Sequence, residues 1–189
     1  MGNMVESIRV WSKQHRSVYD TLMETGRYVA KRDFVHLDLE EHAPLVLEAY
    51  DWLVRHSPGA AQKPPDAELP VWLSYEGEAT MMQSENTVIF ELCIEKDRIT
   101  PLNIAKWGAI LNFSYIPLDG ADEKAHRAEM AALGLSDAKA CMSQFYPQVK
   151  AKIVQSWDRL FDENVKMGNE LCYGLVWELK REWIRSVQR

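Results

Sequence analysis

Two glutamates stand in otherwise apolar stretches of the chain, where a carboxylate could act as a general acid or base. Glu91 is the central residue of TVIFELCIE, residues 87–95, and Glu178 lies near the end of LCYGLVWEL, residues 171–179. Side chains alternate across a strand, so apolar residues on both faces indicate a strand that is covered on both sides. Burial raises the pKa of a carboxyl group, and such groups serve as proton donors or acceptors. Glu91 and Glu178 are therefore the candidate catalytic residues.

A structural role is the alternative for both glutamates. The chain has 22 lysines and arginines, and each glutamate could pair with one of them or meet water at a strand end. A carboxylate that was buried without a partner would be strongly destabilising, so some donor or cation must lie near each of them. The sequence alone leaves both interpretations open.

Tryptophans are the second feature that could serve a ligand site. There are seven in 189 residues, and Trp11 and Trp72 fall on expected strands. Aromatic walls with a few polar groups line many small-molecule clefts. Aromatic residues at strand or helix spacing also form ordinary cores, as expected for Trp107 and Trp157 on the apolar sides of helices.

Composition excludes several function classes. The net charge of −6 is spread along the chain, which does not favour nucleic-acid binding, and no apolar run could cross a membrane. The five histidines show no ligand spacing, so no metal site is predicted. Phosphate-binding glycine loops and the common hydrolase motifs are absent. Three distant cysteines in apolar settings indicate reduced thiols in a cytosolic protein.

Periodicity predicts the elements that must position these residues. Apolar alternation predicts strands at 8–14, 70–76, 87–95 and 170–179, and helical spacing predicts helices at 15–26, 40–59, 100–114, 116–147 (in two pieces, broken at Gly134) and 147–162. Thr100 and Pro101 suit the N-cap and first position of the third helix. This order predicts an α+β protein with a mostly antiparallel sheet and helices packed against it. The length predicts a single globular domain, residues 1–189.

Several short stretches together resemble a bacterial family known as domain of unknown function 3841. The stretches are Val10–Gln14, Tyr50–Trp52, Pro70–Tyr75, Glu91–Ile99, Trp107–Asn112, Ser156–Asp162 and Trp177–Lys180. Their order and spacing carry the resemblance from about residue 8 to the C-terminus. This chain has Tyr173-Gly174 where family members often carry Gln-Ala. The resemblance implies no particular activity.

A second resemblance is to the ADP-ribosyltransferase-like fold, through the opening strand, helix and glycine and the late strand with its short tail. That fold builds a NAD cleft from a split sheet, with a polar residue on the first strand and an acid on a late one. By position, Gln14 and either Glu170 or Glu178 would take these places, although a Glu-x-Glu or Gln-x-Glu pair is missing. The resemblance implies NAD as a substrate. Gln14 is then the expected polar residue at the cofactor, and Trp11 and Trp72 are the expected cofactor-binding aromatic residues of the cleft. Trp11 and Gln14 share a site only if the first strand ends or bulges near Lys13.

Two functions follow from these observations. The first is nucleotide handling of the ADP-ribosyltransferase-like type, by a cytoplasmic protein. The second is a non-catalytic factor that binds another protein, for example one carried by a prophage or mobile element. A cleft that contains Trp11, Gln14 and Glu91 would favour the first, and the same residues in a dry core would favour the second.

Overall fold

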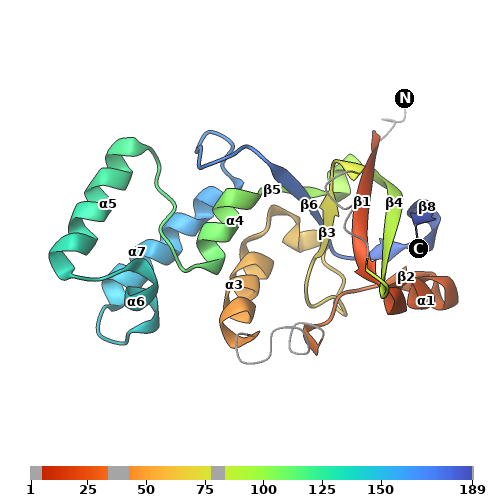
Figure 1. The fold of residues 1–189 in the computed structure, drawn as a ribbon, viewed down its shortest axis with the longest axis horizontal. Helices are drawn as coiled ribbons and strands as arrows, with labels where there is room; N and C mark the ends of the chain where they lie inside the picture. The colour runs from red at the N-terminus through yellow and green to blue at the C-terminus, as the bar shows by residue number, and fades with distance from the viewer. Residues whose placement is uncertain (1–5, 34–42, 78–83, 189) are drawn as a thin grey trace. The chain divides into compact units, whose positions relative to one another are not determined.

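The computed structural model describes residues 6–33, 43–77 and 84–188, and it shows an α+β protein (Figure 1). Contacts along the chain divide it into two compact units. Unit 1 comprises residues 1–101 and 172–189, and unit 2 comprises residues 102–171. The expectation of a single domain stays a prediction. Within the described ranges, no helix has both the length and the apolar character that a bilayer crossing requires.

A six-stranded sheet forms the centre of unit 1. Its strands run in the order β5-β6-β3-β1-β4-β8, so strands from the two ends of the chain flank β4 (Figure 1). The strands are β1 (Ser7–His15), β3 (Val71–Ser74), β4 (Thr87–Glu95), β5 (Thr100–Asn103), β6 (Cys172–Val176) and β8 (Ile184–Gln188). The pairs β1–β3, β1–β4, β3–β6 and β4–β8 are antiparallel. The predicted antiparallel sheet is confirmed.

One face of the sheet carries the hydrophobic core of unit 1. Alternation along β1 and β4 places Val10, Phe90 and Leu92 on this face, all fully buried. Helix α1 (Arg16–Thr25) covers the face with Val18 and Leu22. The helix ends at Gly26, whose φ of 79° is the left-handed conformation that glycine adopts without strain, as the sequence predicted.

The other long helix of unit 1 is α3 (Ala43–His56), which the 3₁₀ turn η2 (Pro58–Gln62) follows. Trp52 and Leu53 are buried, as the apolar periodicity predicted. A hydrogen bond of 2.9 Å from the Trp72 indole N–H to the Tyr50 hydroxyl links this helix to β3. The early acids at residues 40–41 lie outside the described residues.

The predicted helix start at Thr100 and Pro101 is wrong. Residues Thr100–Asn103 form the edge strand β5, and helix α4 (Ile104–Leu111) begins after Asn103. The Asn103 side chain accepts a 3.0 Å hydrogen bond from the Lys106 backbone N–H and is the true N-cap. Proline lacks a backbone N–H, which suits an edge strand as well as a first helical turn, so the proline signal was ambiguous.

The end of the chain also differs from the prediction. The closing strand stops at Val176, and Glu178 lies in the connection to β7 (Leu179–Lys180), which pairs with β2 (Arg27–Tyr28). After the turn η6 (Arg181–Trp183), the tail forms β8, for which no strand was expected. The exposed polar residues of β8 weaken the alternation on which a strand prediction depends.

Unit 2 is helical within the described residues that follow β5. Its elements are α4, α5 (Gly120–Leu133), α6 (Asp137–Met142), α7 (Pro147–Ser156) and the turn η5 (Trp157–Phe161). The predicted break at Gly134 is confirmed, because this residue has a φ of 65° and caps α5. Ile153 and Trp157 are buried, as their spacing predicted. The Lys106 side chain is buried and donates to the carbonyl oxygens of Arg159 and Asp162 at 2.9 and 2.7 Å.

Candidate functional site

The sheet brings three of the five sequence-predicted site residues onto one face. Trp11 lies opposite Glu91 on β4 and opposite Ser74 on β3. Residues opposite each other in an antiparallel pair project to the same side, and Trp72 shares that side because it precedes Ser74 by two residues. Gln14 pairs with Val88 in unbroken register, three residues after Trp11, and so it projects to the core side. The strand has no bulge at Lys13 that would bring Gln14 and Trp11 together.

Glu91 is held by two partners on its face of the sheet. Its Oε1 lies 3.1 Å from Nε of Arg9, and its Oε2 accepts a 2.7 Å hydrogen bond from the Ser186 hydroxyl. The side chain is 23% exposed. Both oxygens are engaged, which is the arrangement expected of the structural alternative.

Glu178 also has cationic partners. It forms an ion pair with Arg27 and lies 3.5 Å from Nζ of Lys180, with its side chain 16% exposed. Arg27 donates as well to both oxygens of Asp66, at 2.7 and 2.9 Å, and the Asp66 and Glu178 carboxylates raise the pKa of its guanidinium. The hollow beside Glu178, next to Trp177 and Trp183, has a volume of about 30 Å³. That volume holds about one water molecule.

Gln14 and Trp72 take part in one hydrogen-bonded chain. The Gln14 side-chain N–H donates to the Ser12 hydroxyl at 2.8 Å, and that hydroxyl donates to the Trp72 carbonyl oxygen at 2.8 Å. The Trp72 ring packs edge-on against Tyr173, with centroids 6.4 Å apart. These contacts connect β1, β3 and β6, and the ligand roles of Gln14, Trp11 and Trp72 stay predictions.

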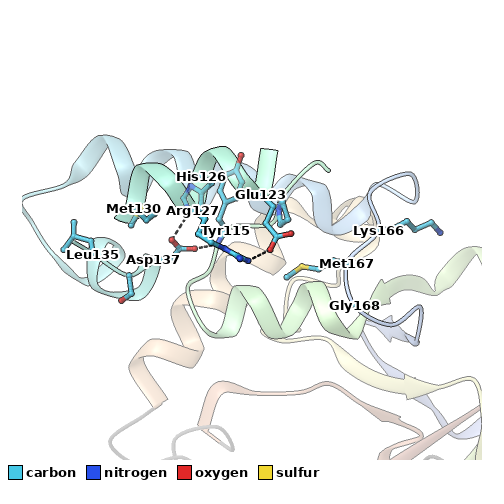
Figure 2. Close-up of a pocket in the computed structure, with 12 residues that line it drawn as sticks. Tyr115, Glu123, His126, Arg127, Met130, Leu135, Asp137, Lys166, Met167 and Gly168 are labelled. Carbon is cyan, nitrogen blue, oxygen red and sulfur yellow. Dashed lines mark hydrogen bonds and ion pairs between the residues drawn. The ribbon is translucent and has the colours of Figure 1, made fainter. Parts of the chain in front are cut away.

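A much larger cavity lies in unit 2 (Figure 2). Its volume is about 500 Å³, and residues from α5, from the turn between α5 and α6, and from the segment after η5 line it. The lining is mixed. Apolar surface comes from Met130, Leu135 and Met167. Arg127 and Lys166 bring positive charge, and Glu123 and Asp137 bring negative charge.

His126 and Asp137 form the most buried polar pair of this lining. His126 Nε2 lies 2.8 Å from Oδ1 of Asp137, and the other carboxylate oxygen accepts a 2.8 Å hydrogen bond from the Tyr115 backbone N–H. The Tyr115 ring stacks on the imidazole, with centroids 4.0 Å apart and an angle of 15° between the planes. Figure 2 shows the Asp137 carboxylate between His126 and Tyr115. The imidazole is therefore fixed in position and orientation.

A second set of contacts fixes Tyr115 from its hydroxyl end. The hydroxyl donates to the Asp122 carboxylate at about 3 Å, and Arg159 bridges the two, 2.8 Å from Asp122. The Leu118 backbone N–H, the Tyr115 hydroxyl and the Arg159 guanidinium lower the pKa of Asp122. The Arg159 cation also lies 5.3 Å from the centre of the tyrosine ring. These contacts fix the position of the Tyr115 side chain in the wall of the cavity.

The cations of the lining pair with exposed carboxylates. Arg127 pairs with Glu123 one turn before it on α5, and Lys166 lies 2.9 Å from Glu170. All four side chains are largely exposed. Exposed ion pairs are weak, so an anionic ligand could exchange for either carboxylate.

Sequence reasoning missed the cavity residues. His126 and Asp137 lie in the stretch 116–147, for which the sequence predicted two helical pieces and no site residue. One signal was present, because His126 and Met130 are four residues apart on a polar helix and both are buried. The left-handed Gly134 reverses the chain and returns Asp137 to His126, a contact that spacing does not reveal.

Fold and site together define an α+β protein whose helical unit contains a cavity of small-molecule size. The model of the domain of unknown function DUF3841 matches residues 9–185, nearly the whole chain, and the protein belongs to that family. No curated protein and no solved structure matches the chain.

Proposed function

We propose that this DUF3841 protein binds a nucleotide in the cavity of unit 2, with NAD as the first candidate. The observation that carries the proposal is the cavity volume of about 500 Å³. Ligand sites of about 300–1,000 Å³ are typical for molecules of this size.

The chemistry of the lining supports a ligand with an apolar part and an anionic part. Met130, Leu135 and Met167 offer apolar surface for a base, and Arg127 and Lys166 offer cations for phosphates. His126 and Asp137 add polar groups in fixed positions. A nucleotide combines all of these requirements in one molecule.

NAD handling of the ADP-ribosyltransferase-like type is part of the same proposal, as is a cytoplasmic, bacterial setting. The three free cysteines Cys93, Cys141 and Cys172 support a reducing compartment. The sheet face with Trp11, Trp72 and Glu91 is the competing location for NAD. The two locations predict different effects of mutation.

Isothermal titration calorimetry with NAD tests the proposal and its location. We expect wild-type protein to bind NAD and Arg127→Ala to weaken binding by about tenfold, the effect of losing one charged hydrogen bond. Lys124→Ala is the matched control, because Lys124 is an exposed cation on the same helix that does not line the cavity. Trp72→Phe should bind as wild type does. Absence of NAD binding by the wild type would overturn the proposal, and a loss only in Trp72→Phe would move the site to the sheet.

Protein binding is the second candidate function, and one observation favours it. Met142 and Phe145, at the end of α6 and in the loop after it, are 60% and 88% exposed and lie three residues apart. Exposed apolar side chains that form a patch mark protein-binding surfaces. The variant with Met142→Ser and Phe145→Ser should lose a partner that copurifies with the wild type from its host, while NAD affinity is unchanged. Identical copurification profiles would count against this candidate.

A further inference from the structure

One nitrogen of the buried imidazole in unit 2 has no hydrogen-bond partner. His126 lines the cavity with its side chain only 8% exposed, and its Nδ1 has no partner among the described residues. Buried polar atoms in proteins are nearly always paired, so an exception needs an explanation.

The contacts of Asp137 determine which ring nitrogen carries the proton. A carboxylate can only accept hydrogen bonds, and Asp137 accepts from His126 Nε2 at 2.8 Å and from the Tyr115 backbone N–H at 2.8 Å. The Nε2 atom therefore carries the hydrogen. In the neutral imidazole, Nδ1 is then a lone-pair acceptor. The hydrogen bond from Nε2 to Asp137 fixes which edge of the ring faces Asp137, and the stacked Tyr115 ring fixes the plane of the imidazole.

We propose that Nδ1 of His126 accepts a hydrogen bond from an O–H or N–H group of the ligand in the cavity. This inference rests on the proposed function, and it narrows the ligand to a molecule that carries a neutral donor, such as a ribose hydroxyl or an amide, beside its anionic group. Nδ1 is shielded from solvent, so a donor reaches it only after side chains of the lining shift. The lining includes the flexible side chains of Met130 and Met167. The bond then forms without competition from bulk water.

The tautomer can be tested in the absence of any ligand. In ¹⁵N NMR spectra of histidine-labelled protein at about pH 8, where a free imidazole is neutral, we expect His126 to show a protonated Nε2 and an unprotonated Nδ1. Asp137→Asn should invert this pattern. Its amide oxygen can accept from the Tyr115 N–H, and its amide N–H₂ then donates to Nε2. A protonated Nδ1 in the wild type would overturn the inference.

Ligand selectivity tests the bond itself. We expect His126→Phe, which keeps an aromatic ring against Tyr115, to weaken NAD binding by about tenfold. Binding of inorganic pyrophosphate, an anion that lacks the ribose hydroxyls and the amide, should be unchanged. In the wild type, NAD should also move the Nδ1 resonance upfield, as a new hydrogen bond does.

The outcomes separate the two proposals. Equal NAD affinity in wild type and His126→Phe, with both folded by circular dichroism, would overturn the hydrogen bond and leave the nucleotide site standing. Equal losses of NAD and pyrophosphate binding would assign His126 a structural role only and would also overturn it. A wild type that binds no NAD would overturn the proposed function.

Discussion

At the scale of single residues, both candidate catalytic carboxylates form ion pairs with nearby cations. Glu91 meets Arg9 and Ser186, and Glu178 meets Arg27 and Lys180. Because Arg9 is mostly exposed, its pair with Glu91 is screened by water and contributes little. Both glutamate side chains are also more exposed, at 23% and 16%, than the His126 side chain of unit 2, at 8%.

Glu91→Ala should lower the free energy of unfolding by about 1 kcal/mol, through the loss of the Ser186 hydrogen bond and a partly exposed ion pair. Glu91→Gln should cost less, since the amide oxygen can still accept from Ser186. Urea unfolding followed by circular dichroism measures both, with the exposed Glu85→Ala as control. A loss above about 3 kcal/mol would contradict this weak coupling, because it would require a fully buried charge.

Asp122 should make the protein sensitive to acid. Its pKa lies below the value of 3.8 that an unperturbed aspartate has, so its stabilising effect is full above that value and is lost as the pH falls through the lowered pKa. Unfolding measured between about pH 7 and pH 2 should show Asp122→Asn clearly less stable than wild type at neutral pH. The difference should shrink in acid. A gap that stays constant across this range would contradict the ionic role of Asp122.

At the scale of elements, β6 approaches its surroundings so closely that it needs a glycine. A Cβ atom at Gly174 would lie 2.6 Å from Cγ2 of Ile99 and 3.3 Å from the Tyr75 hydroxyl. Ile99 is buried in the core of unit 1, so it has little room to move. In this chain, Ile99 occupies the space that the methyl group of an alanine at position 174 would need.

Gly174→Ala should therefore destabilise the protein by about 1–3 kcal/mol, as overpacked cores do. The same substitution in an Ile99→Ala background should cost much less, because the clashing methyl group is gone. A double-mutant cycle from chemical unfolding measures this coupling. Gly108→Ala is the control, since a Cβ there meets nothing within 4 Å. Additive effects of Gly174→Ala and Ile99→Ala would rule out the clash.

At the scale of the whole molecule, the question is whether the two compact units unfold together. Each has its own buried residues, with Leu92 fully buried in unit 1 and Trp157 nearly so in unit 2. The length of the chain predicts one cooperative domain. Two compact units could instead unfold in two separate transitions.

Leu92→Ala and Trp157→Ala provide that test. Each should cost about 2–5 kcal/mol by removing a large core side chain. If the chain is one domain, calorimetry should show a single transition that moves to lower temperature in both variants. Two transitions, of which each variant shifts a different one, would show that the units are separate domains.

The sequence by itself determined the elements whose signals are local. Strands β1 and β4, helix α1 with its stop at Gly26 and the break at Gly134 were all predicted, because alternation, helical spacing and left-handed glycines act over a few residues. The wrong helix start at Thr100 also came from a local signal. Proline at position 101 suits an edge strand as well as the first turn of a helix.

Only the tertiary structure decided which of these residues meet. Trp11 lies opposite Glu91, 80 positions along the chain, whereas Gln14 is turned to the other face. Strand β8, with its weak alternation, exists because β4 offers an unpaired edge. His126 and Asp137 form a pair only because the chain reverses between α5 and α6. Such contacts depend on the path of the whole chain and on the packing of its elements. The spacing of neighbouring residues in the sequence determines neither the path nor the packing.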